Sequence, residues 1–427
     1  MSEDRKLQNV IDEILSLQSI YKNKVKDIKH TRFLYTKLLH EKNSNPMTGL
    51  TGLRGSGKTV LFLQLLDALD NAIYISLDDF QIRPFNLFKL AQMLQEDYNI
   101  KYLLLDEIHN IPNWSVYLKQ IYDILDLKVY FTSSVSLDIL NTKVDLARRV
   151  IIRTLPVLSY REYLLLAHNQ EHKTKSLAEI LDTNQYTADH LLEAEFKNYL
   201  ESPLPSLLNM TRPNRINVIR NILHTAIERD LAAAFPLTYN ELLQIKQMLN
   251  FLMLLPSPDI SLSQLAKNLL ITKYKAQKYV NLLQKLFIVH IVYPKGTNVL
   301  QEPKILLNIP FRAYDDATDY LRFSDSAIDH SELLAGTIKE DFFVSMLKAV
   351  NQPVYYLKTR RGKKTPDYLI ELREKGRVKR YVVEIGGRKK GFSQFKGIKP
   401  GFVKRIAVYP FVRKRGSIPL YEFGFLY

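Results

Sequence analysis

The sequence has no cysteine among its 427 residues, which excludes disulfide bonds and thiolate metal sites. It also has no apolar run that approaches the roughly 18 residues of a membrane-spanning helix. Four of the first six residues are charged, and the segment lacks the apolar core of a signal peptide. Long linkers, internal repeats and low-complexity segments are missing too. We therefore expect a cytoplasmic protein of several folded domains with no membrane partner.

The positive charge of the chain is concentrated near one end. The formal net charge is +16, and residues 351–427 hold 20 Lys and Arg against 5 Asp and Glu, whereas the rest of the chain holds 40 against 39. A basic segment on a neutral body favours an anionic partner, and nucleic acid is the usual one. We expect nucleic acid, DNA rather than RNA. A basic surface that only aids solubility is the alternative.

The run with the clearest chemistry is rich in glycine and fits G-x-x-x-x-G-K-[ST]. It consists of Gly52, Leu53, Arg54, Gly55, Ser56, Gly57, Lys58 and Thr59. In this motif the glycines turn backbone N–H groups toward phosphates, the lysine reaches the β- and γ-phosphates, and the hydroxyl binds Mg²⁺. Apolar residues at helical spacing over 61–69 predict a helix directly after it, whose N-terminus favours anions. The run predicts ATP and Mg²⁺ as ligands. A chance glycine-rich turn is the alternative.

A second element of the same chemistry follows downstream. The apolar run 102–105 ends in two carboxylates, Asp106 and Glu107. Buried parallel strands read as continuous apolar runs, and ligands bind at their carboxyl ends. We expect Asp106 to hold Mg²⁺ together with Thr59, and Glu107 to orient and deprotonate the attacking water. Alone, the pair would be interpreted as a solvated strand end, but its order after the glycine-rich run favours nucleotide binding.

The pattern along the chain predicts an α/β fold. Short apolar segments near 48–50, 72–77, 102–105, 129–131 and 150–155 alternate with helical patterns, which is typical of a parallel sheet with helices on both faces. We divide the chain into five segments: an N-terminal helical segment (1–45), a P-loop core (46–160), a helical region (161–237), a winged helix-turn-helix (238–312) and a small basic α/β domain (313–427).

The winged helix-turn-helix is predicted from two short helices followed by a hairpin. Ser261 to Gln264 forms a capping box that begins the first helix, and the second begins near Thr272. The exposed face of the second helix carries Lys273, Lys275 and Lys278, which would meet a DNA groove. A protein–protein joint with a solvated lysine face is the alternative.

The C-terminal segment carries three acidic residues in an order that resembles the PD-(D/E)xK nuclease fold. Glu340 lies in a predicted helix, and Asp367 and Glu384 belong to two predicted strands. Such carboxylates hold a divalent ion for phosphodiester cleavage. The lysine expected two residues after the glutamate is replaced by Gly386. The nearby Arg388, Lys389 and Lys390 are candidates for nucleic-acid binding, and the two lysines are also possible substitutes. A degenerate fold that only binds is favoured over cleavage.

Beyond these elements, the chain resembles bacterial and archaeal AAA+ ATPases that carry a C-terminal region of the DUF4143 type. The matching motifs lie at residues 106–114, 130–134, 145–149, 158–163, 264–269 and 384–390. The resemblance implies that Ser133 or Ser134 is a polar sensor of the γ-phosphate or the attacking water. It also implies that Arg149, or the adjacent Arg148, acts as an arginine finger on a neighbouring subunit of a homo-oligomer. A structural ion pair is the alternative for the arginine.

The sequence therefore predicts an ATP-hydrolysing switch whose nucleotide state controls C-terminal modules that bind nucleic acid. Two alternatives stay open. One is a nuclease gated by ATP, with a second metal site at Glu340, Asp367 and Glu384. The other is a signalling switch whose C-terminal half binds protein.

Overall fold

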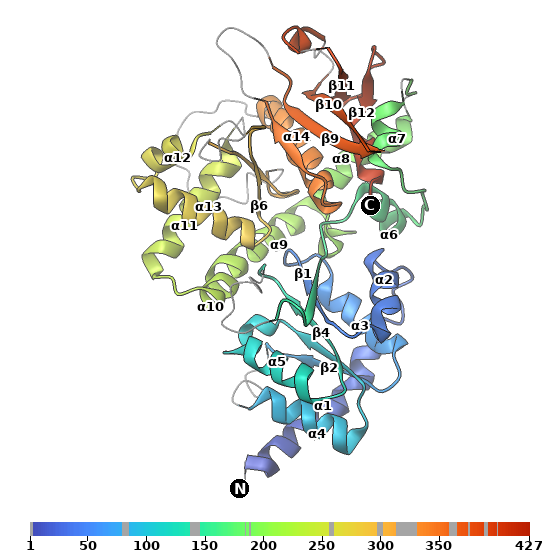
Figure 1. Ribbon diagram of the computed structural model, residues 1–427, viewed down its shortest axis with the longest axis vertical. Coiled ribbons are helices and arrows are strands. Elements are labelled where there is room, and N and C mark those ends of the chain that lie inside the picture. The colour runs from blue at the N-terminus through green and yellow to red at the C-terminus, as the bar shows by residue number, and fades with distance from the viewer. Residues whose placement is uncertain are drawn as a thin grey trace. The chain divides into compact units, whose positions relative to one another are not determined.

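The computed structural model describes residues 3–78, 85–136, 146–183, 185–187, 189–255, 260–296, 302–312, 331–357, 365–374, 376–387, 392–398 and 400–427 (Figure 1). The chain divides into two compact units. The first, here called the P-loop unit, comprises Met1–Pro156 and Thr225–Leu237, and the second, the C-terminal unit, comprises Val157–His224 and Thr238–Tyr427. This division differs from the five segments expected, because residues 1–45 and 225–237 both belong to the P-loop unit.

The P-loop unit is built on a five-stranded parallel sheet with the order β2-β3-β4-β1-β5. Its strands are β1 (Met47–Thr51), β2 (Ala72–Ser76), β3 (Tyr102–Asp106), β4 (Lys128–Ser133) and β5 (Val150–Thr154). The three central strands are almost entirely buried, as expected where helices cover both faces. The α/β fold with a parallel P-loop sheet is confirmed.

Helices cover both faces of this sheet. They are α1 (Glu3–Asn23), α2 (Leu34–His40), α3 (Lys58–Ala68), α4 (Leu87–Tyr98) and α5 (Trp114–Ile124). Because side chains alternate along a strand, Leu103 and Leu105 enter one core with α4 and α5, whereas Leu104 enters the other with α2 and α3.

The N-terminal helix belongs to the P-loop unit because it covers the free edge of the sheet. On α1, the Gln18 side chain accepts a bond of 2.9 Å from the N–H of Tyr74 in β2 and donates one of 3.0 Å to its carbonyl. A side-chain amide therefore satisfies backbone groups that an edge strand would otherwise expose. Leu7 and Ile11 of the same helix are buried in the core with α4.

Residues 225–237 return to the P-loop unit from far along the chain. The helix α9 (Arg212–Thr225) leads into a π-helical turn, η5 (Ala226–Leu231), and then into the short α10 (Ala232–Ala234). The chain enters this unit at Thr225 and leaves it at Leu237, with the C-terminal unit on both sides in sequence. Isolated π-turns in helices are frequent at functional sites.

The first half of the C-terminal unit is mainly helical. Its helices are α6 (Tyr160–His168), α7 (Leu177–Asp182), α8 (His190–Glu201), α11 (Tyr239–Leu254), α12 (Leu262–Asn268) and α13 (Lys273–Lys285). After α13, β6 (Val289–Val292) and β7 (Lys304–Leu307) pair antiparallel. The two helices and the hairpin thus follow in the order expected, while the winged-helix assignment stays a prediction.

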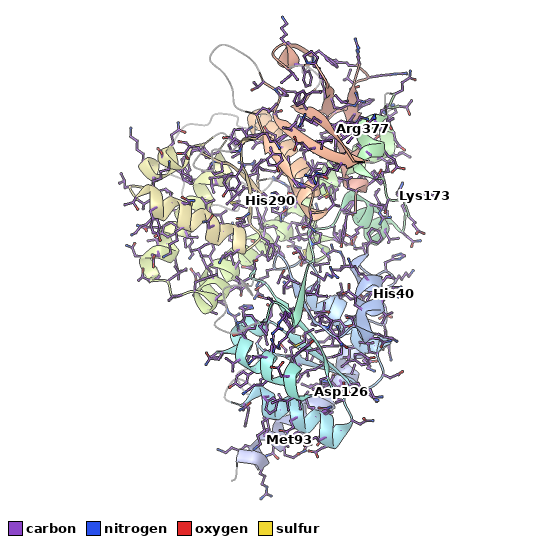
Figure 2. All side chains as sticks on the ribbon, in the orientation of Figure 1. His40, Met93, Asp126, Lys173, His290 and Arg377 are labelled. Carbon is purple, nitrogen blue, oxygen red and sulfur yellow. The ribbon has the colours of Figure 1, made fainter. Side chains whose placement is uncertain are left out.

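The second half contains a mixed sheet with the order β12-β11-β10-β9-β8. Its elements are α14 (Ser331–Ala349), β8 (Val354–Tyr356), β9 (Tyr368–Glu374), β10 (Arg377–Gly386), β11 (Phe402–Val408), β12 (Ser417–Pro419) and η8 (Leu420–Phe425). Strands β10, β11 and β12 are parallel, and β8 and β9 run antiparallel to their neighbours. The exposed Arg377 begins β10 (Figure 2).

A buried ion pair joins the two halves of this unit. The Nε of Arg312 donates to Asp341 in α14 at 2.6 Å, and Nη1 donates to the carbonyls of Leu252 and Leu255, both at 2.8 Å. The side chains of Arg312 and Asp341 are only 3% and 1% exposed. The guanidinium therefore holds the C-terminal end of α11 next to α14 by hydrogen bonds to both.

We expect Asp341→Asn to lower the free energy of unfolding of the C-terminal unit by about 3–5 kcal/mol, because it leaves a buried guanidinium without its counter-charge. Urea denaturation of the full chain would measure the loss. Asp182→Asn is the matched control, since its partner Lys379 is 40% exposed and such pairs contribute less than about 1 kcal/mol. Equal effects of the two substitutions would contradict the prediction.

Candidate nucleotide site

The glycine-rich loop lies between the end of β1 and the start of α3, at the carboxyl edge of the sheet. Gly55 and Gly57 have φ of 84° and 95°, in the left-handed region that glycine adopts without strain. A Cβ on Gly52 would lie 2.3 Å from the Leu155 carbonyl oxygen, so no larger residue fits there. The glycines are therefore required by the path of the loop.

Two side chains of the loop, those of Lys58 and Thr59, are held by hydrogen bonds to neighbouring oxygen atoms. The ammonium of Lys58 is buried and donates to the carbonyl of Gly52 at 2.9 Å. The hydroxyl of Thr59 donates to Asp106 Oδ2 at 2.7 Å. The carboxylate that ends β3 and the hydroxyl that begins α3 thus meet directly, as expected for two ligands of one Mg²⁺ ion.

Asp106 is surrounded by hydroxyl groups. Besides Thr59, it accepts a bond of 2.8 Å from the Tyr74 hydroxyl, and its Oδ1 accepts a short one from Thr132. Burial, reinforced by the Asp106 charge, raises the pKa of Tyr74, which keeps this hydroxyl protonated as a donor. Sequence reasoning missed Tyr74 and Thr132. Thr132 lies within the 130–134 motif, whereas Tyr74 lies within a strand and carries no local signal.

Glu107 has a left-handed backbone, with φ of 58°, directly after β3. This conformation is uncommon for a residue with a side chain and often occurs at functional sites. Its N–H donates to Thr132 at 2.9 Å, and its Oε2 accepts a bond of 2.9 Å from the N–H of Ser134. The carboxylate is thereby tied to the segment that follows β4.

The two serines at the end of β4, Ser133 within the strand and Ser134 directly after it, have different partners. Ser133 contacts His109 Nδ1 at 3.2 Å, and the same nitrogen lies 3.4 Å from Glu107. Burial lowers the pKa of His109, although Glu107 and Asp230 oppose this shift. The hydroxyl of Ser134 donates to Asp230 at 2.6 Å. Ser134 therefore joins Glu107 to a residue that sequence reasoning did not find.

Asp230 comes from the π-helical turn η5, and it is the main residue that the sequence did not reveal. Its carboxylate accepts two bonds from Arg54 of the loop, at 3.1 Å from Nε and 3.0 Å from Nη2. Burial raises the pKa of Asp230, but bonding to Arg54 outweighs this and lowers it below the ordinary value. The pair is therefore ionised. No pattern near residue 230 pointed to the loop.

Arg149 does not lie near this site in its own chain. Its carbonyl accepts from the N–H of Met47, at the first residue of β1, whereas the loop follows the last residue of β1. At a rise of about 3.3 Å per residue, the first and last residues of the five-residue β1 are roughly 13 Å apart. Its guanidinium binds Asp123 at 2.7 Å and 3.1 Å. Within one chain, Arg149 therefore forms an ion pair with Asp123, which was the alternative interpretation. Its role as an arginine finger toward a second copy stays a prediction.

The residues present fit a magnesium triphosphate. Magnesium prefers hard oxygen ligands and keeps several waters, which matches one hydroxyl and one carboxylate. Backbone N–H groups of residues 55–59, at the N-terminus of α3, would bind the phosphates, and Lys58 would exchange its carbonyl partner for phosphate oxygens. The bound ligand would supply an electrophilic γ-phosphorus and a metal ion that neutralises developing charge.

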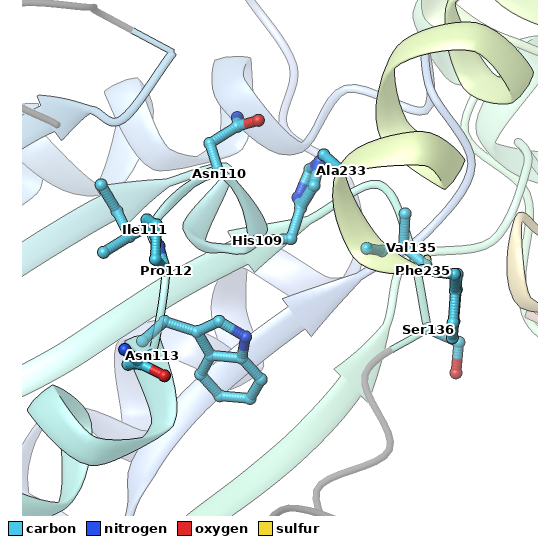
Figure 3. Close-up of a pocket in the computed structure, with 11 residues that line it drawn as sticks. His109, Asn110, Ile111, Pro112, Asn113, Val135, Ser136, Ala233 and Phe235 are labelled. Atoms are coloured by element: carbon cyan, nitrogen blue, oxygen red, sulfur yellow. The ribbon is translucent and has the colours of Figure 1, made fainter. Parts of the chain in front are cut away.

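A cavity of about 530 Å³ lies within the P-loop unit, and His109, two residues after Glu107, is among its lining residues. It is lined by residues 109–114 after β3, by Val135 and Ser136 after β4, and by residues 233–235 of the returning segment (Figure 3). The single tryptophan, Trp114, is among the lining residues and packs against Phe131 in β4.

Two of the three carboxylates of the expected second metal site are in other bonds. Glu340 accepts from the Tyr368 hydroxyl at 2.7 Å and lies 3.7 Å from Lys304, and Asp367 accepts from the N–H of Ile385 at 2.7 Å. Glu384 is buried in β10. Among the described residues, no group of three or more His, Asp or Glu side chains is arranged to hold a metal ion.

Some of the basic residues expected to bind nucleic acid pair with acidic side chains, and others lie outside the described residues. Lys273 pairs with Glu302, and Lys278 lies 2.7 Å from Glu241, so two of the three α13 lysines that were expected to meet DNA have acidic partners. Arg388, Lys389 and Lys390 lie outside the described residues. No helix in the described part of the chain is both long and apolar enough to cross a membrane.

Comparison with known proteins places part of the chain in families. Residues 44–164 match the family model of an AAA domain, and residues 203–308 match a domain of unknown function, DUF8612. The expected DUF4143 region is thus replaced there by DUF8612. An uncharacterized protein of Methanocaldococcus jannaschii is 28% identical over 280 residues, which span 60% of this chain and 59% of that protein.

Solved structures with a related arrangement include a Walker-type ATPase of Pyrococcus abyssi, with a TM-score of 0.44 and 16% identity, over 67% of this chain and 95% of that one. The Orc1 protein of Aeropyrum pernix, solved in complex with DNA, has a TM-score of 0.26 and 15% identity over 70% and 91%. AMPPCP-bound DnaA from Aquifex aeolicus has a TM-score of 0.25 and 14% identity over 59% and 86%. Residues 44–164 thus match an AAA domain, and the structure of this part of the chain is a P-loop α/β fold.

Proposed function

We propose that this protein binds Mg-ATP at residues 52–59 and hydrolyses it, as an AAA-type switch. The observation that carries the proposal is the contact of 2.7 Å between Thr59 and Asp106, beside the buried Lys58. A hydroxyl from the first turn of α3 and a carboxylate from the end of β3 meet there. The match to the AAA domain supports the same chemistry.

Each residue of the site has a role in this proposal. Lys58 and the backbone of the loop bind the phosphates, and Thr59 and Asp106 hold the metal ion. Glu107 orients the attacking water and accepts its proton, which adds about 10²- to 10⁴-fold to the rate. Ser133 and Ser134 hold His109 and Glu107 in place. Arg149 acts as an arginine finger on the site of a second copy in a homo-oligomer.

Nucleic acid is the partner that we propose for the C-terminal unit. The support is the charge of residues 351–427, which hold 20 Lys and Arg against 5 Asp and Glu. Arg413, Lys414 and Arg415 are exposed next to β12 and are candidates for phosphate contacts. DNA is the partner to test first, and a protein partner is the outcome that a negative result would favour.

The proposed function is tested by ATP turnover of the full chain, with Mg²⁺, in the presence and absence of duplex and single-stranded DNA. We expect turnover that needs Mg²⁺ and increases severalfold with DNA. Absence of turnover under all conditions would contradict the ATPase, and turnover that is indifferent to DNA would favour the protein-binding switch. Release of DNA fragments would favour the nuclease.

Direct binding gives the second arm of this test. If about four phosphates are contacted, the affinity for duplex DNA falls about 100-fold between about 50 and 200 mM salt. The variant Arg413→Ala/Lys414→Ala/Arg415→Ala should remove most of this binding. Its matched control, Lys273→Ala/Lys275→Ala/Lys278→Ala, removes the same charge from α13. A larger loss in the control would place the DNA site on the helix-turn-helix elements instead.

A further inference from the structure

Asp230 connects three parts of the nucleotide site. Its carboxylate accepts a forked pair of bonds from Arg54 in the loop and a bond of 2.6 Å from the Ser134 hydroxyl after β4. Its Oδ1 also lies 4.0 Å from His109 Nε2, too far for a hydrogen bond. The residue is 176 positions from Arg54 in sequence, and it reaches the site only because residues 225–237 return to the P-loop unit.

The two partners of this ion pair differ in their freedom to move. The Asp230 side chain is 4% exposed, whereas that of Arg54 is 28% exposed. A flexible, partly solvated arginine can exchange one anion for another, but a buried carboxylate on a helical turn cannot follow it. Arg54 is also the third residue of the loop, between glycines that a phosphate chain must approach.

We propose that Asp230 is a positioning residue that withholds the Arg54 guanidinium from the phosphates and releases it to a γ-phosphate. This inference rests on the proposed ATP binding at residues 52–59. A doubly charged terminal phosphate offers more charge and as many acceptor oxygens as a carboxylate, and arginine binds both in the same forked geometry. A diphosphate lacks that group. The exchange therefore distinguishes the triphosphate from the diphosphate.

Loss of Arg54 leaves Asp230 as a buried carboxylate without its counter-charge, which is unfavourable. The segment 225–237 is then less firmly held in the P-loop unit. Both ends of this segment continue into the C-terminal unit. A change in the segment that follows γ-phosphate binding is therefore transmitted along the backbone to that unit. The segment acts as a sensor of the triphosphate.

The test compares AMPPCP and ADP, each with Mg²⁺, in binding to the full chain. Asp230→Asn removes a negative charge near the phosphates and frees Arg54, so we expect it to bind AMPPCP about tenfold more tightly, with ADP changed less than about threefold. In Arg54→Gln, AMPPCP binding should weaken, and adding Asp230→Asn to it should produce no further gain beyond about threefold. Glu228→Gln, on the same helical turn, is the matched control and should change neither ligand.

A purely structural role of Asp230 makes the opposite prediction. In that case Asp230→Asn would lower the thermal stability and weaken both ligands equally, which would overturn the inference. The inference would also be overturned if Asp230→Asn changed the AMPPCP affinity equally in the wild-type chain and in Arg54→Gln. If wild-type protein binds neither AMPPCP nor ADP, the proposed function fails and the inference fails with it, whereas binding with an unchanged preference rejects the inference alone.

The wild-type chain provides a readout that needs no substitution at the site. Trp114 lines the same cavity as Ala233, Ala234 and Phe235, so its fluorescence reports the position of the returning segment (Figure 3). We expect AMPPCP, but not ADP, to change its emission. The same spectrum with both ligands would contradict release of the segment by the γ-phosphate.

Discussion

Lys58→Ala is expected to abolish tight ATP binding, with a loss of at least about 100-fold in affinity. The ammonium is 5% exposed and reaches the carbonyl of Gly52 inside the loop, so it is already directed at the phosphate position. The triphosphate carries its highest charge at the β- and γ-phosphates, which this lysine contacts in loops of this type. Alanine leaves that charge without its main counter-ion.

The loss would be measured by titrating a fluorescent ATP analogue into wild-type and variant protein. Lys101→Ala is the matched control, because Lys101 is exposed just before β3 and faces no phosphate. The unfolding temperature without nucleotide should change little in either variant. An ATP affinity within about threefold of wild type in Lys58→Ala would place the nucleotide elsewhere and would remove the basis of the proposed function.

Glu107→Gln is expected to keep ATP binding and to lower turnover by about 100-fold or more, which is the usual effect of losing a general base. Glutamine has the same shape, and its carbonyl oxygen can still accept the bond from the N–H of Ser134. Only the ability to take a proton is lost. The substitution therefore separates binding from chemistry.

Single-turnover phosphate release and an independent binding titration would measure the two properties. Glu96→Gln, at an exposed position of α4, removes the same charge away from the site and should leave both unchanged. Near-normal turnover in Glu107→Gln would exclude this residue as the base. Combined loss of binding and turnover would indicate instead that Glu107 has a structural role through Ser134.

Local patterns predicted the parts of the P-loop unit that local chemistry controls. Five short apolar runs predicted the five strands, because a strand buried on both faces must be continuously apolar. The same alternation of strands and helices required a parallel sheet. Glu107 follows the third strand directly, so the edge at which it emerges was known before the structure.

Interactions across long stretches of sequence could not be predicted in this way. Arg149 was expected to act as a finger on a neighbouring subunit, and this stays a prediction; within its own chain it precedes β5, at the edge of the parallel sheet opposite the loop, and Asp123 as its ion-pair partner was not foreseen. Lys273 and Lys278 looked like a free basic face until Glu302 and Glu241 were brought beside them by the fold. Charge partners of this kind are set by tertiary packing and leave no periodic signal.

Short contiguous runs of sequence were enough to locate the glycine-rich loop and its companion carboxylates, because the backbone conformation of such runs is local. The residues that hold the loop in place could be identified only from the fold. Arg54 is neutralised by Asp230, a residue on a helical turn that returns from 176 positions away. The role of a buried carboxylate depends on its charge partner, and the packing of the whole chain determines which partner that is.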